Sequence, residues 1–124
     1  MIIWENEIFF IEPHQSNIPW VKIFTKEPHK ELTDIPKEVR NQMWNIYYTV
    51  EEEMIKYFEP TKVNMASFAN MLPRVHIHVM ARFKEDEYFP NPVWGEKQRE
   101  AKLNLPDFEI FYKRLNKQLT KQFD

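Results

Sequence analysis

The sequence has no cysteine, no strong excess of either charge and no long apolar run, and each absence excludes a class of function. Without cysteine among the 124 residues, disulfides, thiolate chemistry and cysteine-based zinc sites are excluded. The formal net charge is −2, and no long basic run occurs. Because a polyphosphate backbone calls for a basic face, we expect no long nucleic acid as a partner. No stretch approaches the ~20 apolar residues of a membrane-spanning helix.

The amino-terminal segment MIIWENEIFF carries acidic residues where a secretory signal peptide carries positive charge. The share of hydrophobic residues is 43% and that of aromatic residues 15%, which is enough to bury a core. The length suits one domain that spans residues 1–124. We therefore expect a soluble, cytoplasmic, single-domain protein with no membrane partner.

Several short segments are rich in β-branched and aromatic residues, which is typical of strands. The predicted strands are residues 1–4, 8–11, 20–24, 62–68 and 74–83. Prolines and polar residues predict loops over residues 12–19 and 88–94. With a long central helix and a C-terminal helix after residue 107, the pattern predicts an α+β fold, with an antiparallel sheet of about five strands.

The central helix is predicted from apolar residues that recur at helical spacing between Val39 and Tyr57. Thr33 or Asp34 is suited to cap its start, and Pro36 belongs in a first turn. A proline at position 60 prevents the helix from continuing. The predicted helical region is residues 34–57.

The segment RVHIHVMARF, residues 74–83, carries the residues with the clearest chemistry. Because side chains alternate along a strand, one face holds Val75, Ile77 and Val79 and suits a core. The opposite face then holds Arg74, His76, His78, Met80 and Arg82. Two imidazoles beside a guanidinium could bind an anion, and a neutral imidazole can attack phosphorus.

Two other interpretations of the His-x-His pattern stay open at this point. The histidines could simply lie on a solvated strand face. They could also bind a metal, because two histidines two residues apart on a strand are common zinc ligands. A third ligand would then have to come from elsewhere in the chain, and the candidates are His14, His29, Glu12 and Asp86.

A longer segment, VNMASFANMLPRVHIHVMARFKEDEYFPNPVWG, resembles the signature region of the histidine triad (HIT) family. It is most similar to the short bacterial members related to diadenosine polyphosphate hydrolases. The upstream segment IPWVKIFTKEPHKELTDI resembles the strand, loop and helix start that precede the central helix of the family. The resemblance covers roughly residues 8–95.

The resemblance implies roles for three residues of the strand. His76 matches the middle, nucleophilic histidine, and His78 matches the third, which binds and polarises the phosphate. Arg74 stands where the family has its first histidine, so the triad is incomplete. A guanidinium there could bind phosphate oxygens, or it could point to solvent and leave catalysis weaker.

The resemblance also implies four substrate-side positions around the histidines. Asn64 and Asn70 match polar residues near the sugar and phosphates, Glu12 matches a group on the ribose side, and Trp94 matches the rim of the pocket. Ala69 stands where glycine is usual, and its Cβ would restrict the approach of the backbone to a phosphate.

By resemblance, the substrate is a nucleoside phosphoramidate or dinucleoside polyphosphate, attacked at the α-phosphorus through a nucleotidyl-His76 intermediate. No metal or cofactor is implied, and a homodimer that pairs through the central helix and a strand is expected. The alternative is a degenerate nucleotide-binding module with little turnover, because the first histidine is missing.

Overall fold

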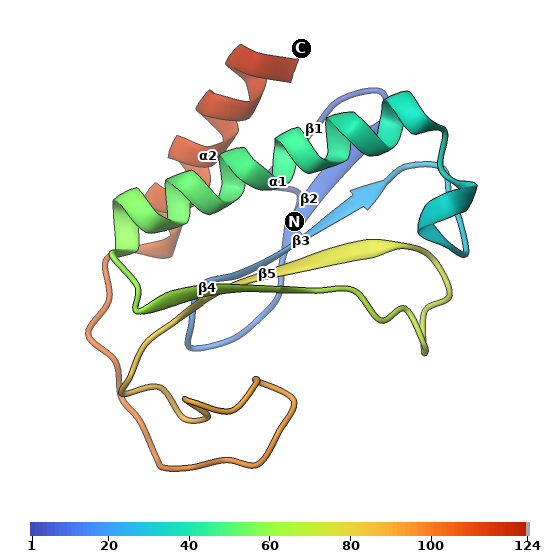
Figure 1. Cartoon of the computed structure of the whole chain (residues 1–124). Coiled ribbons are helices and arrows are strands. Elements are labelled where there is room, and N and C mark those ends of the chain that lie inside the picture. Colours follow the sequence, from blue (N-terminus) through green and yellow to red (C-terminus); the bar gives the residue numbers. More distant parts are fainter. Residues whose placement is uncertain (124) are drawn as a thin grey trace.

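Five antiparallel strands form one sheet in the spatial order β1-β2-β3-β5-β4 (Figure 1). The structure is a computed structural model and describes residues 1–123. The strands are β1 (Trp4–Glu5), β2 (Phe9–Pro13), β3 (Trp20–Thr25), β4 (Lys62–Ala66) and β5 (His76–Arg82). Together with the helices they confirm the predicted α+β fold, and β4 and β5 are adjacent as expected.

The prediction of the strand ends was less accurate. β2 continues to Pro13, which is paired with Val21 of β3, so the first two residues of the predicted 12–19 loop belong to a strand. Proline is tolerated there because the pairing of β2 with β1 ends at Ile11. β4 ends at Ala66 and β5 begins at His76, which leaves residues 67–75 as a connection at the strand ends.

Two helices, α1 (Lys37–Phe58) and α2 (Phe108–Phe123), cover one face of the sheet (Figure 1). The prediction that Thr33 or Asp34 caps α1 was wrong. Both residues belong to a short 3₁₀ turn, η1 (Leu32–Asp34), and the Asp34 carboxylate accepts a hydrogen bond from the Glu31 amide instead. Pro36 is the N-cap residue and makes no side-chain cap. The C-cap residue after Phe58 is Glu59, which has a left-handed conformation (φ 49°).

The alternation predicted for β5 is confirmed, because its two faces have different surroundings. Val75, Ile77 and Val79 are buried in the core between the sheet and the helices. On the other face, Met80 packs with Trp20 in a smaller cluster that residues of the 84–107 segment help to cover. Figure 1 shows this segment on the side of the sheet away from α1. The histidine-bearing face is therefore the one that the helices leave open.

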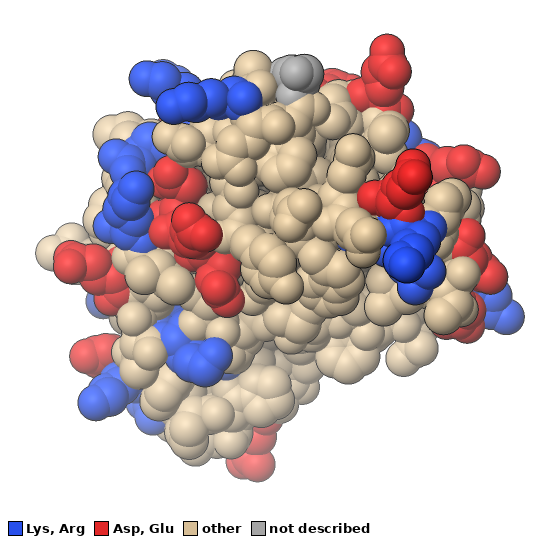
Figure 2. Space-filling view, turned by 45° about the horizontal axis from the view of Figure 1, so that its top comes forward, with Lys and Arg blue, Asp and Glu red and all other residues tan. Residues whose placement is uncertain are grey.

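Charged side chains of both signs are interspersed around an uncharged centre on the face shown in Figure 2. Among the helices of residues 1–123, none is long and apolar enough to cross a membrane.

Candidate functional site

His76 and His78 lie side by side on the open face of β5. The centroids of their rings are 4.9 Å apart, so the prediction that they share one face is confirmed. His76 is only 7% exposed, and its ring stacks on that of Phe24 with centroids 4.8 Å apart and an interplanar angle of 16°. His78 is half-buried. In the sheet it is paired with Lys22 of the neighbouring strand β3 and with Ala66 of the neighbouring strand β4.

A backbone contact fixes the form of the neutral His76 ring. Its Nδ1 atom lies 2.9 Å from the carbonyl oxygen of Arg74. Since a carbonyl oxygen only accepts hydrogen bonds, Nδ1 must carry the proton. The neutral ring then has its free lone pair on Nε2, which is the form that a nucleophilic imidazole requires.

The partner of His78 fixes the opposite tautomer. The indole Nε1–H of Trp20 donates a 3.0 Å hydrogen bond to Nδ1 of His78. Because an indole only donates, Nδ1 of His78 must be unprotonated, and the neutral ring carries its proton on Nε2. Burial lowers the pKa of His78 to about 4, and the neighbouring His76, His14 and Lys22 contribute to the shift. At neutral pH, His78 is therefore a neutral donor suited to a phosphoryl oxygen.

A cavity of about 410 Å³ opens beside the two rings. Its lining combines both histidines with the connection between β4 and β5 and with the 84–107 segment: Phe68, Ala69, Asn70, Met71, Leu72, His76, His78 and Trp94. The size lies within the range of small-ligand sites. Of the residues predicted on the substrate side, the structure brings Asn70 and Trp94 together with the histidines.

Ala69 adopts a left-handed conformation with φ 54° at the wall of this cavity. Left-handed backbone is the conformation for which glycine is the usual residue. This is the position at which the resemblance noted in the sequence implies glycine, and the backbone of Ala69 has the conformation that glycine favours.

The structure places Arg74, Asn64 and Glu12 outside the lining of this cavity. The guanidinium of Arg74 donates to the backbone carbonyls of Thr25 and Lys26. Glu12 forms an ion pair with Lys22 across β2 and β3, with 3.3 Å between Oε1 and Nζ.

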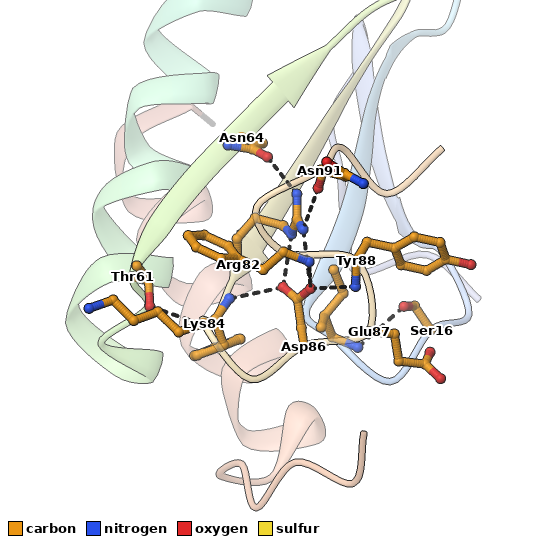
Figure 3. Close-up of polar contacts among 12 residues, drawn as sticks. Ser16, Thr61, Asn64, Arg82, Lys84, Asp86, Glu87, Tyr88 and Asn91 are labelled. Carbon is orange, nitrogen blue, oxygen red and sulfur yellow. Dashed lines mark hydrogen bonds and ion pairs between the residues drawn. The ribbon is translucent and has the colours of Figure 1, made fainter. Parts of the chain in front are cut away.

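Asn64 belongs to a buried polar network centred on Arg82 (Figure 3). Arg82 Nε and Nη2 donate to the two carboxylate oxygens of Asp86, at 2.9 and 3.1 Å. The same guanidinium donates to Oδ1 of Asn64 at 2.9 Å and to the backbone oxygen of Asn91 at 2.7 Å. Because Asn91 lies three residues before Trp94, the network fixes the segment that brings Trp94 to the cavity.

The Asp86 carboxylate is held ionised by this network. Burial acts to raise the pKa of Asp86, but the hydrogen bonds from Arg82 and from the amides of Phe83, Phe89 and Tyr88 outweigh it and lower the pKa to about 2.

Three of the four candidate third metal ligands contact other side chains. Asp86 is bound to Arg82, Glu12 is paired with Lys22, and the ring of His14 stacks on Trp20 with centroids 3.9 Å apart. Within residues 1–123, no group of three or more histidine, aspartate or glutamate side chains is arranged to hold a metal ion.

Sequence reasoning missed Trp20 and Phe24 of β3 as neighbours of the two histidines, and it named His14 only as a possible metal ligand. Trp20 fixes the His78 ring, Phe24 stacks on His76, and His14 approaches His78 with ring centroids 6.4 Å apart. Burial, together with Lys22, lowers the pKa of His14. Alternation along residues 20–24 could have placed Trp20, Lys22 and Phe24 on one face, but the pairing of β3 with β5 is not visible in the sequence.

Comparisons with known proteins agree with this fold. The sequence model of the HIT domain matches residues 2–85. A histidine triad protein from Bradyrhizobium japonicum has a similar structure, with a TM-score of 0.79 and 24% identity over 94% of this chain and 88% of that one. A histidine triad protein from Marinobacter aquaeolei also has a TM-score of 0.79, with 23% identity over 96% and 90% of the two chains. No curated protein sequence gives a match. Since the HIT domain model matches more than half of this chain, the chain belongs to the HIT domain family.

Proposed function

We propose that this protein is a nucleotidyl hydrolase or transferase in which His76 is the nucleophile. Membership of the HIT family supports nucleotide binding, and proteins of this family are generally nucleotide hydrolases or transferases. The observation that carries the proposal for this chain is the contact between His76 Nδ1 and the carbonyl of Arg74. It leaves the Nε2 lone pair available beside a cavity that a phosphate ester can enter.

The reaction proceeds in two displacements at the α-phosphorus. His76 Nε2 forms a bond to phosphorus as the bond to the leaving group breaks, and the leaving group departs with the bonding electron pair and takes up a proton. Water then attacks the same phosphorus, loses a proton, and releases the nucleoside monophosphate as the bond between nitrogen and phosphorus breaks. The neutral His76 ring is thereby restored.

The residues around His76 have distinct tasks in this proposal. His78 donates its Nε2–H to a phosphoryl oxygen, which stabilises the charge that develops there. Asn70 and Trp94 bind the substrate at the wall and rim of the cavity. Glu12 lies on β2 in the same row across the sheet as Lys22 and His78, and we assign it to the ribose side. The substrates are nucleoside phosphoramidates or dinucleoside polyphosphates.

We also propose a homodimer in which two copies meet along β4. β4 is an edge strand of the sheet, and an unpaired edge readily accepts a second strand. A hollow of about 400 Å³ lies at this edge and is lined by residues 62–66 of β4 together with Tyr47 of α1 and Trp94. Light scattering at micromolar concentration tests this, and a stable monomer would contradict it.

A panel of adenosine and guanosine phosphoramidates and dinucleoside polyphosphates tests the enzymatic proposal. Wild type should hydrolyse at least one of them, and His76→Ala should abolish turnover while nucleotide affinity stays nearly intact, because the nucleophile acts mainly in the transition state. His29→Ala is the matched control, since its ring lies outside the cavity lining. Binding of nucleotide with no difference in rate between wild type and His76→Ala would support a binding module instead.

A further inference from the structure

Arg74 connects the start of β5 to the end of β3. Its Nη2 atom donates to the backbone carbonyl of Thr25, the last residue of β3, and to that of Lys26 at 3.2 Å. A guanidinium that donates to two consecutive carbonyls holds its own backbone at a defined distance from them. The main chain of residue 74 is therefore tied to β3 by its own side chain.

The same guanidinium lies against the aromatic stack that ends in His76. Its central carbon is 5.4 Å from the ring centroid of Phe24 and 5.8 Å from that of Phe10, both within the range of a cation–π contact. The rings of Phe10 and Phe24 stack with centroids 4.7 Å apart and an interplanar angle of 2°. Phe24 in turn stacks on His76. Arg74 thus stabilises the ring that supports one face of the His76 imidazole.

Arg74 also reaches the edge of the imidazole, through its backbone rather than its side chain. Its carbonyl oxygen is the acceptor for Nδ1 of His76. One residue therefore governs two contacts of His76, the stacked face through Phe24 and the protonated edge through the carbonyl.

We propose that Arg74 is a positioning residue, which fixes the tautomer and orientation of His76, and that it does not bind the substrate phosphate. The geometric part stands on its own, and its consequence for catalysis rests on the proposed function. Two features separate Arg74 from the phosphate. Its guanidinium donates to the backbone carbonyls at the end of β3, and Arg74 is not among the residues that line the cavity beside His76 and His78.

Nitrogen-15 NMR of the histidine side chains tests the geometric part without any substrate. At pH 8, above the ordinary pKa of histidine, wild type should show the proton of His76 on Nδ1. Arg74→Gln should shift the His76 nitrogen signals toward a mixture of both tautomers, because the paired hydrogen bonds to the Thr25 and Lys26 carbonyls and the cation are both lost. Arg74→Lys should give a smaller change, because an ammonium keeps the charge but not the planar guanidinium that makes these two hydrogen bonds.

Arg114→Gln is the matched control, because Arg114 also makes an ion pair (with Glu53) and a cation–π contact (with Tyr57), but on α2. It should leave the His76 signals unchanged. Thermal unfolding of each variant establishes that it is folded at the temperature of the measurement.

Kinetics and binding of AMP then separate positioning from phosphate binding. Arg74→Gln should lower kcat by about tenfold to 100-fold, with the Kd for AMP and its salt dependence within about twofold of wild type. An unchanged His76 tautomer in Arg74→Gln overturns the inference, whatever happens to AMP binding. Should the tautomer change while wild type turns over no substrate, the positioning role stands and the proposed enzymatic function fails.

Discussion

Replacement of Asp86 by asparagine removes the charge that balances a buried guanidinium. Asp86 and Arg82 are each only 2% exposed in their side chains. The carboxylate accepts two hydrogen bonds from Arg82 and one each from the amides of Phe83, Tyr88 and Phe89. In Asp86→Asn one oxygen becomes an NH₂ group, which faces donors instead of accepting from them (Figure 3).

The expected loss follows from the burial of the pair. Removing one partner of a buried ion pair lowers the free energy of unfolding by about 3–5 kcal/mol. We expect a loss of about 3 kcal/mol here, because the side-chain amide oxygen of the asparagine in the variant can still accept hydrogen bonds. With an m-value of about 2 kcal/mol per molar urea, the unfolding midpoint should fall by about 1.5 M. Glu5→Gln is the control, because Glu5 and Lys26 form an exposed pair that is worth at most about 1 kcal/mol.

The measurement is urea unfolding of wild type, Asp86→Asn and Glu5→Gln at pH 7, repeated toward pH 2. The difference between wild type and Asp86→Asn should narrow as the pH falls from about 4 toward 2, because over this range the unfolded wild-type carboxylate binds a proton more readily than the folded one, whose pKa is lowered to about 2. A loss no larger than that of Glu5→Gln at pH 7 would refute the assigned role of the network.

The site and its surroundings lead to three more expected outcomes. Trp20→Phe removes the donor to His78 Nδ1 and should lower kcat by about tenfold or more while nucleotide affinity changes little, as measured by steady-state kinetics and calorimetry. Ala69→Gly should raise the free energy of unfolding by up to about 1 kcal/mol in urea, because glycine adopts the φ of 54° without strain; a destabilised variant would contradict this. The wild-type free energy of unfolding should fall as the pH drops from 6.5 toward 4 and again from about 4 toward 2. The pKa values of His78 and Asp86 are lowered by folding, so each contributes stability above its ordinary pKa that is lost on acidification; a flat profile across both windows would contradict it.

The elements that the sequence predicted well are those with a strong local period. The apolar spacing between Val39 and Tyr57 identified α1, and the alternation around His76 placed both histidines on one face. The strand ends were less predictable, because the pairing of Pro13 with Val21 depends on a neighbouring strand and not on the propensity of proline.

The sequence indicated only the part of the candidate site that lies along β5 and in the segments next to it in the chain. His76, His78, Asn70 and Trp94 meet at one cavity. The contributions of Trp20 and Phe24 could not be predicted, because β3 becomes a neighbour of β5 only after a crossover of the chain. The direction in which a long side chain points could not be predicted from the sequence either. No local pattern indicates that the Arg74 guanidinium binds the carbonyls at the end of β3.

The most direct test of the proposed function is to look for a covalent nucleotide on His76. Wild type mixed with adenosine 5′-phosphoramidate is quenched within one turnover, kept at alkaline pH where a bond between nitrogen and phosphorus survives, and analysed by peptide mass spectrometry. We expect an adenylyl group on His76 in wild type and none at that position in His76→Ala. An adduct on another residue, or turnover by His76→Ala at the wild-type rate, would contradict the assignment of His76 as the nucleophile.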